Sequence, residues 1–369
     1  MIVGVLKENK KGENRVALIP SGVEVMQQHG HTVLVERHAG ATSGFPDSDY
    51  EKAGARIAEA GEIFGRAALI LRVKEPQPQE YRLLKEGQIY FSYLHLAASE
   101  KVTWALMEAG SINIAYETIQ KAGGSLPLLI PMSEVAGPMA VQEGAKYLEM
   151  AQGGHGILLG GVPGVDPGTV LILGGGVVGS RAARMACGLG AKVYLLDINL
   201  DRLRYLSDIM PGNCILMYSN PANIRELIKT ADLVIGAPLI PGSKTPVLVT
   251  RDMVRTMKPG AVLVDVAIDQ GGCVETSHET THDQPIYVWE GIVHYAVSNM
   301  PGALPKTGTL ALTNASLPYA LEIADKGWRK ALAENPEIRL GANVVKGKVT
   351  YKGVAEAFGL EYTRVEQLL

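Results

Sequence analysis

Three polar side chains in the first third of the chain each follow directly after a short apolar run: Lys74, His95 and Glu117. If the runs are parallel strands, their carboxyl ends meet at one edge of a sheet, where ligands bind in open α/β folds. A lysine can hold an anion there, and a histidine can carry a proton near neutral pH. The three residues therefore predict a shared crevice. The alternative is that polar residues simply resume after each buried strand.

Two further candidates are predicted in loops. Arg15 follows the charged segment KENKKGEN, which we expect to be flexible, and Asp269 stands just past the apolar run 261–266. The ordinary alternatives are a solvated arginine and a turn or cap aspartate.

A glycine-rich motif begins at the end of the apolar run 170–173. Gly174, Gly176 and Gly179 form G-x-G-x-x-G, in which the first glycine permits a tight turn, the second admits a pyrophosphate and the third allows close packing of helix and strand. Asp197 then ends the next strand, where a carboxylate binds a ribose hydroxyl and repels a 2′-phosphate. This combination predicts a site for NAD rather than NADP.

The segment His278-Glu-Thr-Thr-His282 matches the zinc-protease signature H-E-x-x-H. That signature binds metal only on a helix, because two histidines four residues apart then share one face. The threonines and the nearby Pro285 disfavour a helix here, so we predict no metal site.

The alternation of apolar runs and helix-like stretches predicts an α/β protein with two doubly wound, Rossmann-like domains, mostly parallel sheets and an active site in the cleft between them. Residues 1–128 with 305–369 are expected to form a discontinuous substrate and catalytic domain, and residues 129–304 an NAD-binding domain. The expected strands are 2–6, 32–35, 69–73, 89–94, 112–116, 170–173, 192–196, 233–235, 261–266 and 292–297, and the expected helices are 21–28, 133–150 and 310–334.

Composition narrows the possible partners. The 369 residues are 47% hydrophobic and 20% charged, and 35 basic against 38 acidic side chains leave a formal charge of −3. This balance argues against nucleic acid or a membrane surface as a partner. The apolar runs are too short to span a bilayer, and three cysteines without a C-x-x-C pair fit a reducing cytoplasm.

Several blocks of the sequence resemble one family, the alanine dehydrogenases, along nearly the whole chain. These blocks are GVLKENKKGENRVALIP, RVKEP, YLHLA, MSEVAG, LGGGVVG, VDVAIDQGGC, NMPGALPKT and ALTNA. The related transhydrogenase nucleotide-binding subunits share the general plan.

The resemblance implies roles for individual residues. Arg15 and Lys74 would bind the substrate, and His95 and Asp269 would be catalytic. It also implies a homohexamer. The residues that would contact NAD, besides the three motif glycines, are Ser133, Asp197, Arg202, Ser219, Leu239, Ala267, Ile268, Asp269, Gln270, His278, Val297, Ser298, Asn299 and Met300. The chain departs from the common family pattern at Pro238, His278 and Gly308, and His278 stands where an arginine is frequent.

The first functional hypothesis is therefore the reversible oxidative deamination of L-alanine to pyruvate and ammonium with hydride transfer to NAD. Two alternatives stay open. One is a non-catalytic, transhydrogenase-like subunit that binds a nucleotide, and the other is a dehydrogenase of the same plan that acts on a larger amino acid or imine.

Overall fold

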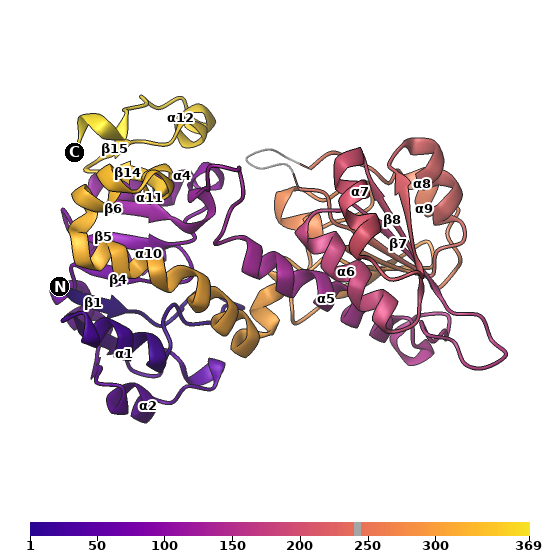
Figure 1. Ribbon diagram of the computed structural model, residues 1–369, viewed down its shortest axis with the longest axis horizontal. Helices are drawn as coiled ribbons and strands as arrows, with labels where there is room; N and C mark the ends of the chain where they lie inside the picture. The colour runs from indigo at the N-terminus through magenta and orange to yellow at the C-terminus, as the bar shows by residue number, and fades with distance from the viewer. Residues whose placement is uncertain (240–244) are drawn as a thin grey trace. The chain divides into compact units, whose positions relative to one another are not determined.

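The computed structural model describes residues 1–239 and 245–369, and the chain divides into two compact units (Figure 1). The first unit comprises Met1–Met132 and Gly302–Leu369, and the second comprises Ser133–Pro301. The first boundary lies inside helix α5 (Ile130–Tyr147), so it comes four residues later than the sequence predicts. The second boundary comes three residues earlier, at 301/302.

The first unit contains an eight-stranded sheet in which β1 has β2 and β4 as neighbours. Its strands, in order across the sheet, are β15 (Lys348–Val349), β14 (Ala342–Val345), β6 (Ile112–Ala115), β5 (Ile89–Ser92), β4 (Leu69–Leu71), β1 (Ile2–Val5), β2 (Thr32–Glu36) and β3 (Arg56–Ala58). The six N-terminal strands are parallel, in the order 3-2-1-4-5-6 that defines a doubly wound sheet. The predicted fold class is confirmed for this unit.

Helices cover both faces of this sheet because its strands are apolar on both sides. One face packs against α1 (Pro20–Gln28) and α10 (Pro305–Glu334). The other packs against α3 (Ala60–Arg66) and α4 (Glu100–Glu108).

Several predicted bounds in the first unit need correction. Strand β5 ends at Ser92 rather than at residue 94, and α10 begins at Pro305 rather than at residue 310. The α1 helix begins at Pro20, one residue before the predicted start, because proline suits the first helical position. Strand β4 ends at Leu71, two residues earlier than predicted, because the Val73 N–H donates to a side chain instead of a neighbouring strand.

The C-terminal segment completes the first unit. The α10 helix, shown in yellow-orange in Figure 1, is interrupted at Gly327, which has φ 73°, and strand β14 then pairs antiparallel with β6. This antiparallel addition closes one edge of an otherwise parallel sheet.

The second unit contains a seven-stranded sheet. Its strands, in order, are β12 (Ile286–Trp289), β13 (Ile292–Tyr295), β11 (Val262–Asp265), β10 (Leu233–Gly236), β7 (Thr169–Leu173), β8 (Lys192–Asp197) and β9 (Cys214–Tyr218). All are parallel except β12, and the order again reverses at the first strand, β7. This reversal is the topological switch point at which such sheets bind ligands.

Two helices lie closely together on one face of this second sheet. A Cβ at Gly137 of α5 would overlap the Val178 carbonyl oxygen of α6 (Val177–Gly188). Helix α8 (Pro221–Ile228) packs on the opposite face. In the part of the chain that the structure describes, no helix is both long and apolar enough to cross a membrane.

Candidate functional site

Lys74, His95 and Glu117 follow three adjacent parallel strands, β4, β5 and β6, and lie beyond their carboxyl ends. The fold therefore brings the three loops together at one edge of the first sheet, as the sequence predicts. Glu117, which follows β6, also bonds directly to the loop after β5.

The contact between these two loops is a set of hydrogen bonds from backbone to carboxylate. The His95 N–H donates to Glu117 Oε1 at 2.6 Å, and the Leu94 N–H reaches both carboxylate oxygens at 3.2 Å. His95 has φ 48° and ψ 37°, a left-handed conformation that few non-glycine residues adopt. Glu117 thus holds the strained turn that carries His95.

Arg15 is buried, with only 2% of its side chain exposed, so the alternative of a solvated cation is wrong. Its Nε donates to Glu13 Oε1 at 2.7 Å, and Nη2 donates to Glu13 Oε2. Burial raises the pKa of Glu13, but the bonds from Arg15 outweigh it and leave that pKa at about 2. The pair is therefore ionised, and Nη1 of Arg15 contacts the Met132 sulfur.

Lys74 is also buried. Its ammonium lies 5.8 Å from the centre of the Tyr93 ring, and that ring stacks on His95 at 6.0 Å. Burial and the nearby Arg15 guanidinium lower the pKa of Lys74. With Glu13, the two cations carry one net positive charge, which suits a single carboxylate.

His95 lies beside these cations, on the loop after β5. Desolvation by the surrounding chain and the charges of Lys74, Lys10 and Arg15 lower its pKa, so the imidazole is neutral at pH 7. The residue is exposed, and the charges of Lys74, Lys10 and Arg15 oppose its protonation. A neutral imidazole has a free ring nitrogen that can accept a proton.

The glycine motif of the second unit follows β7, at the switch point of its sheet. Gly174 has φ 103°, and a Cβ at Gly179 would overlap the Gly174 carbonyl oxygen, so neither position accepts a side chain. A Cβ at Gly176 would meet nothing within 4 Å, which leaves room above the start of α6. These features fit a dinucleotide whose pyrophosphate lies at the helix N-terminus.

Asp197 is tied to the same motif. Its Oδ2 accepts the Gly175 N–H at 2.6 Å, and its Oδ1 accepts the Asn199 N–H at 2.7 Å. Arg202 donates from Nε to the Gly175 carbonyl at 2.7 Å, and the Ser219 N–H bonds the Asp197 carbonyl at 2.9 Å. The carboxylate that is predicted to bind the ribose is thus held by the glycine turn and by the Asn199 N–H.

Asp269 lies in a 3-10 turn, Val266–Gln270, after β11. The buried Asp265 carboxylate orders this turn by accepting the N–H groups of Ala267, Cys273 and Val274 at 3.0–3.2 Å. The Asn299 N–H donates to Asp269 at 3.1 Å.

This bond joins the two predicted cofactor stretches, 267–270 and 297–300. The side chains of Ala267, Ile268, Val297 and Met300 are buried, so these four residues can offer a ligand mainly their backbone. Ser133 lies on α5, and Leu239 is 53% exposed next to the residues outside the described part.

The H-E-x-x-H segment is not helical, as the sequence predicts. His278 stacks on Tyr287 with 3.7 Å between ring centres, whereas His282 Nε2 lies 3.3 Å from the Asn299 carbonyl oxygen. The two histidines therefore have separate partners. Within residues 1–239 and 245–369, no three His, Cys, Asp or Glu side chains cluster as metal ligands would.

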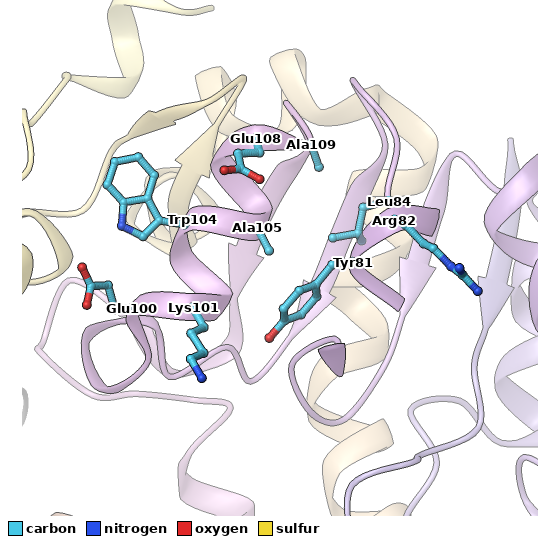
Figure 2. A pocket seen from close by; sticks show the side chains of 9 residues that line it. All are labelled: Tyr81, Arg82, Leu84, Glu100, Lys101, Trp104, Ala105, Glu108 and Ala109. Atoms are coloured by element: carbon cyan, nitrogen blue, oxygen red, sulfur yellow. The ribbon is translucent and has the colours of Figure 1, made fainter. Parts of the chain in front are cut away.

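Two surface grooves lie away from these residues. The first, of about 670 Å³, runs between α4 and the 3-10 helix η2 (Pro78–Leu83), and Figure 2 shows Tyr81 and Trp104 among its lining side chains. The second, of about 820 Å³, lies between α5 and residues 156–161. Neither groove is lined by a predicted catalytic or cofactor residue.

Sequence reasoning missed several supporting residues. Glu13, Asp265 and Gly137 carry no motif of their own, although Glu13 lies two residues before Arg15 and Asp265 four before Asp269. The segment KENKKGEN, expected to be flexible, is held by side-chain contacts of Glu8, Asn9 and Lys10, so that expectation is wrong.

Comparisons with known proteins place these features in context. The family model described as "Alanine dehydrogenase/PNT, N-terminal domain" matches residues 4–136, and that described as "Alanine dehydrogenase/PNT, C-terminal domain" matches residues 140–352.

Curated relatives match the full length. An alanine dehydrogenase of Staphylococcus haemolyticus is 55% identical over all of this chain and 99% of its own length. One of Methanococcus maripaludis is 53% identical, with both chains covered completely.

Solved structures agree with these matches. A structure titled L-alanine dehydrogenase superposes with a TM-score of 0.95 at 50% identity and covers 97% of this chain and 99% of its own. A transhydrogenase from Sinorhizobium meliloti superposes with a TM-score of 0.82 at 26% identity. The match covers 95% of this chain and 99% of the transhydrogenase chain.

Proposed function

Because the chain belongs to the alanine dehydrogenase/PNT family, we propose that it catalyses the reversible oxidative deamination of L-alanine with NAD, giving pyruvate, ammonium and NADH. The observation that carries this proposal is the pair of buried cations, Arg15 and Lys74, beside a neutral His95. A protein that only bound a nucleotide would have no use for such a carboxylate site.

The substrate carboxylate binds through charge. Arg15 and Lys74 are buried, so their attraction for an anion is weakly screened by water. Glu13 holds Arg15 in one orientation, which fixes the carboxylate and with it the direction of the Cα–H bond. Lys74 also reaches the carbonyl oxygen of pyruvate in the reverse reaction.

Proton transfer falls to His95 and Asp269. The neutral imidazole accepts a proton from the substrate ammonium, or from the water that attacks the imine, and returns it in the reverse direction. The Asp269 carboxylate stabilises the cationic amine or imine. Once the Cα–H has left as a hydride, the substrate is an imine; water then adds to the imine carbon, and the C–N bond breaks to release ammonium and pyruvate.

The cofactor site is assigned to the second unit. The N–H groups around Gly174, Gly176 and Gly179 suit the pyrophosphate, and Asp197 suits the adenosine ribose. When bound, NAD accepts the hydride from the substrate Cα. The remaining residues proposed to contact NAD are Ser133, Arg202, Ser219, Leu239, Ala267, Ile268, Asp269, Gln270, His278, Val297, Ser298, Asn299 and Met300.

An NADH-forming assay with a panel of amino acids tests this function. We expect L-alanine to give the highest kcat/KM, and glycine, L-serine, L-valine and L-lysine lower values. No NADH with any amino acid, combined with tight NADH binding, would favour the nucleotide-binding subunit instead. Preference for L-lysine over L-alanine would favour the dehydrogenase of larger substrates.

Assembly and compartment are also part of the proposal. We infer from the family resemblance that the protein is a homohexamer. We also infer a location in the cytoplasm, which is consistent with three cysteines that form no disulfide. Light scattering coupled to size exclusion should give six times the chain mass of 39.4 kDa. A monomer or dimer at micromolar concentration would contradict the hexamer.

A further inference from the structure

Three consecutive residues, Glu8, Asn9 and Lys10, bind the loop that carries Lys74. The loop, residues 72–80, leaves β4, and the three residues follow β1, which is the neighbour of β4 at the switch point of the first sheet. Asn9 Nδ2 donates to Glu80 at 3.1 Å, and Lys10 Nζ donates to Glu75 at 2.7 Å. One segment thus holds the loop along most of its length.

Glu8 makes the contact nearest to Lys74. Its Oε1 accepts the Val73 N–H at 2.7 Å and the Lys74 N–H at 3.4 Å, and its Oε2 accepts Arg72 Nε at 3.3 Å. Only 2% of the Glu8 side chain is exposed. The Val73 N–H thus has a buried side-chain carboxylate, and not a strand carbonyl, as its acceptor.

Arg72 links Glu8 to a second buried carboxylate. Its side chain is fully buried, and Nη1 donates to Glu80 Oε2 at 2.5 Å. Glu80 also accepts the Gln77 N–H at 2.7 Å, further along the loop. Glu80 is therefore a second carboxylate bonded to Arg72, like Glu8, but it accepts no hydrogen bond from the Lys74 backbone.

Burial raises the pKa of Glu8 to about 7. A buried network of two carboxyl groups and a guanidinium therefore adds little stability compared with apolar residues of similar volume, because desolvation offsets the Coulomb attraction. The effect of such a network is on geometry, because its hydrogen bonds form in only one arrangement of the groups that they join. Here that arrangement sets the backbone from which a long, flexible lysine side chain extends.

We propose that Glu8 is a positioning residue for the reaction: its carboxylate fixes the backbone at Val73 and Lys74, and so places the Lys74 ammonium for the substrate carboxylate. Glu8 does not touch the substrate. The inference rests on the proposed role of Lys74 in substrate binding.

The test compares Glu8→Ala and Glu8→Gln with Glu80→Ala, which removes a carboxylate from the same network without touching Lys74. Glu8→Ala should raise the KM for L-alanine and for pyruvate at least about tenfold, with the KM for NAD unchanged, because small displacements of a binding group are costly. Glu8→Gln keeps an oxygen acceptor, so its substrate KM should stay within about threefold of the wild-type value. Glu80→Ala should lower Tm by a similar amount but also keep substrate KM within about threefold.

Equal increases of substrate KM in Glu8→Ala and Glu80→Ala would overturn the proposal, because they would show a general loosening of the loop. If Glu8→Ala does not fold, Glu8→Asp, whose shorter side chain withdraws the carboxylate from the Val73 and Lys74 N–H groups, is made alone and together with Lys74→Ala, and Glu80→Asp serves as its control. Glu8→Asp should raise the substrate KM in the wild-type background but not in the Lys74→Ala background, and full additivity would contradict the proposal. Lys74→Ala alone with an unchanged substrate KM would instead refute the role assigned to Lys74.

Discussion

The Glu117 carboxylate and the His95 backbone are joined by a 2.6 Å hydrogen bond that stabilises a left-handed residue at the end of β5. A non-glycine residue in this conformation is strained, and the cost is offset only where its surroundings hold it. The imidazole is therefore presented by a turn whose shape depends on a side chain from the next strand.

Glu117→Ala should lower kcat by about 10- to 100-fold while the substrate KM changes less than about threefold, because the turn that aims His95 relaxes. Glu117→Gln retains an oxygen for the His95 N–H and should recover most of kcat. Steady-state kinetics with L-alanine and NAD measures both. If Glu117 itself moved protons, the glutamine variant would be as inactive as the alanine variant.

His95→Ala should lower kcat by about 10²- to 10⁴-fold, the usual contribution of general acid–base catalysis. NADH affinity, measured by fluorescence titration, should stay near the wild-type value because the cofactor residues are assigned to the other unit. His29→Ala is the matched control, since His29 lies in the same unit and bonds the exposed Asp325. A folded His95→Ala protein with more than about a third of wild-type turnover would remove His95 from the mechanism.

Gly179→Ala should abolish NADH binding or prevent folding of the second unit, because the new methyl group would overlap the Gly174 carbonyl oxygen. Gly188→Ala provides the control on the same helix. A Cβ at Gly188 meets nothing within 4 Å, and alanine is favoured in helices by about 1 kcal/mol over glycine, so Tm should rise or stay constant. Normal NADH binding by Gly179→Ala would show that the glycine turn does not have this geometry.

Asp197→Ala should narrow the preference for NAD over NADP, because it removes a negative charge that repels a 2′-phosphate. The same change removes the acceptor of the Gly175 N–H, so kcat/KM with NAD should also fall. Asp201→Ala is the control, because Asp201 is exposed and pairs with Arg204. Equal use of both cofactors by the wild-type protein would refute the assigned role of Asp197.

Glu13 should make stability depend on acid pH. Its pKa is about 2 in the folded chain against an ordinary value of 4.5, so the folded state keeps the carboxylate ionised where the unfolded chain takes up a proton. The resulting stabilisation, about 3 kcal/mol, is complete above pH 4.5 and is lost as the pH falls towards 2.

Urea unfolding between pH 3 and 7 measures this effect. The pH dependence of the free energy of unfolding should be weaker in Glu13→Gln than in the wild-type protein. Glu62→Gln, which removes a partly exposed carboxylate paired with Arg56 and Arg66, is expected to change the curve less, because solvent screens these surface pairs. If the free energy of unfolding depended on pH equally in Glu13→Gln and in the wild-type protein, the lowered pKa of Glu13 would be contradicted.

The sequence alone was sufficient to predict the α/β class, most strands and the glycine motif. These predictions succeed because they depend on local patterns: apolar runs of strand length, and glycines at positions where a side chain would collide with the backbone. The loop residues Lys74 and His95 were recognisable because each ends a strand, and parallel strands end at the same edge.

The tertiary structure alone decided how those residues are held. Glu8 and Arg72 are 64 positions apart in the sequence, and Glu117 lies 22 positions from His95, so no local pattern connects a carboxylate with the turn that it orders. The burial of Arg15 could likewise not be predicted, because a charged segment is expected to be solvated unless its partners are known. Such contacts form only when strands distant in sequence become neighbours in a sheet, which places a buried carboxylate against backbone N–H groups that need an acceptor.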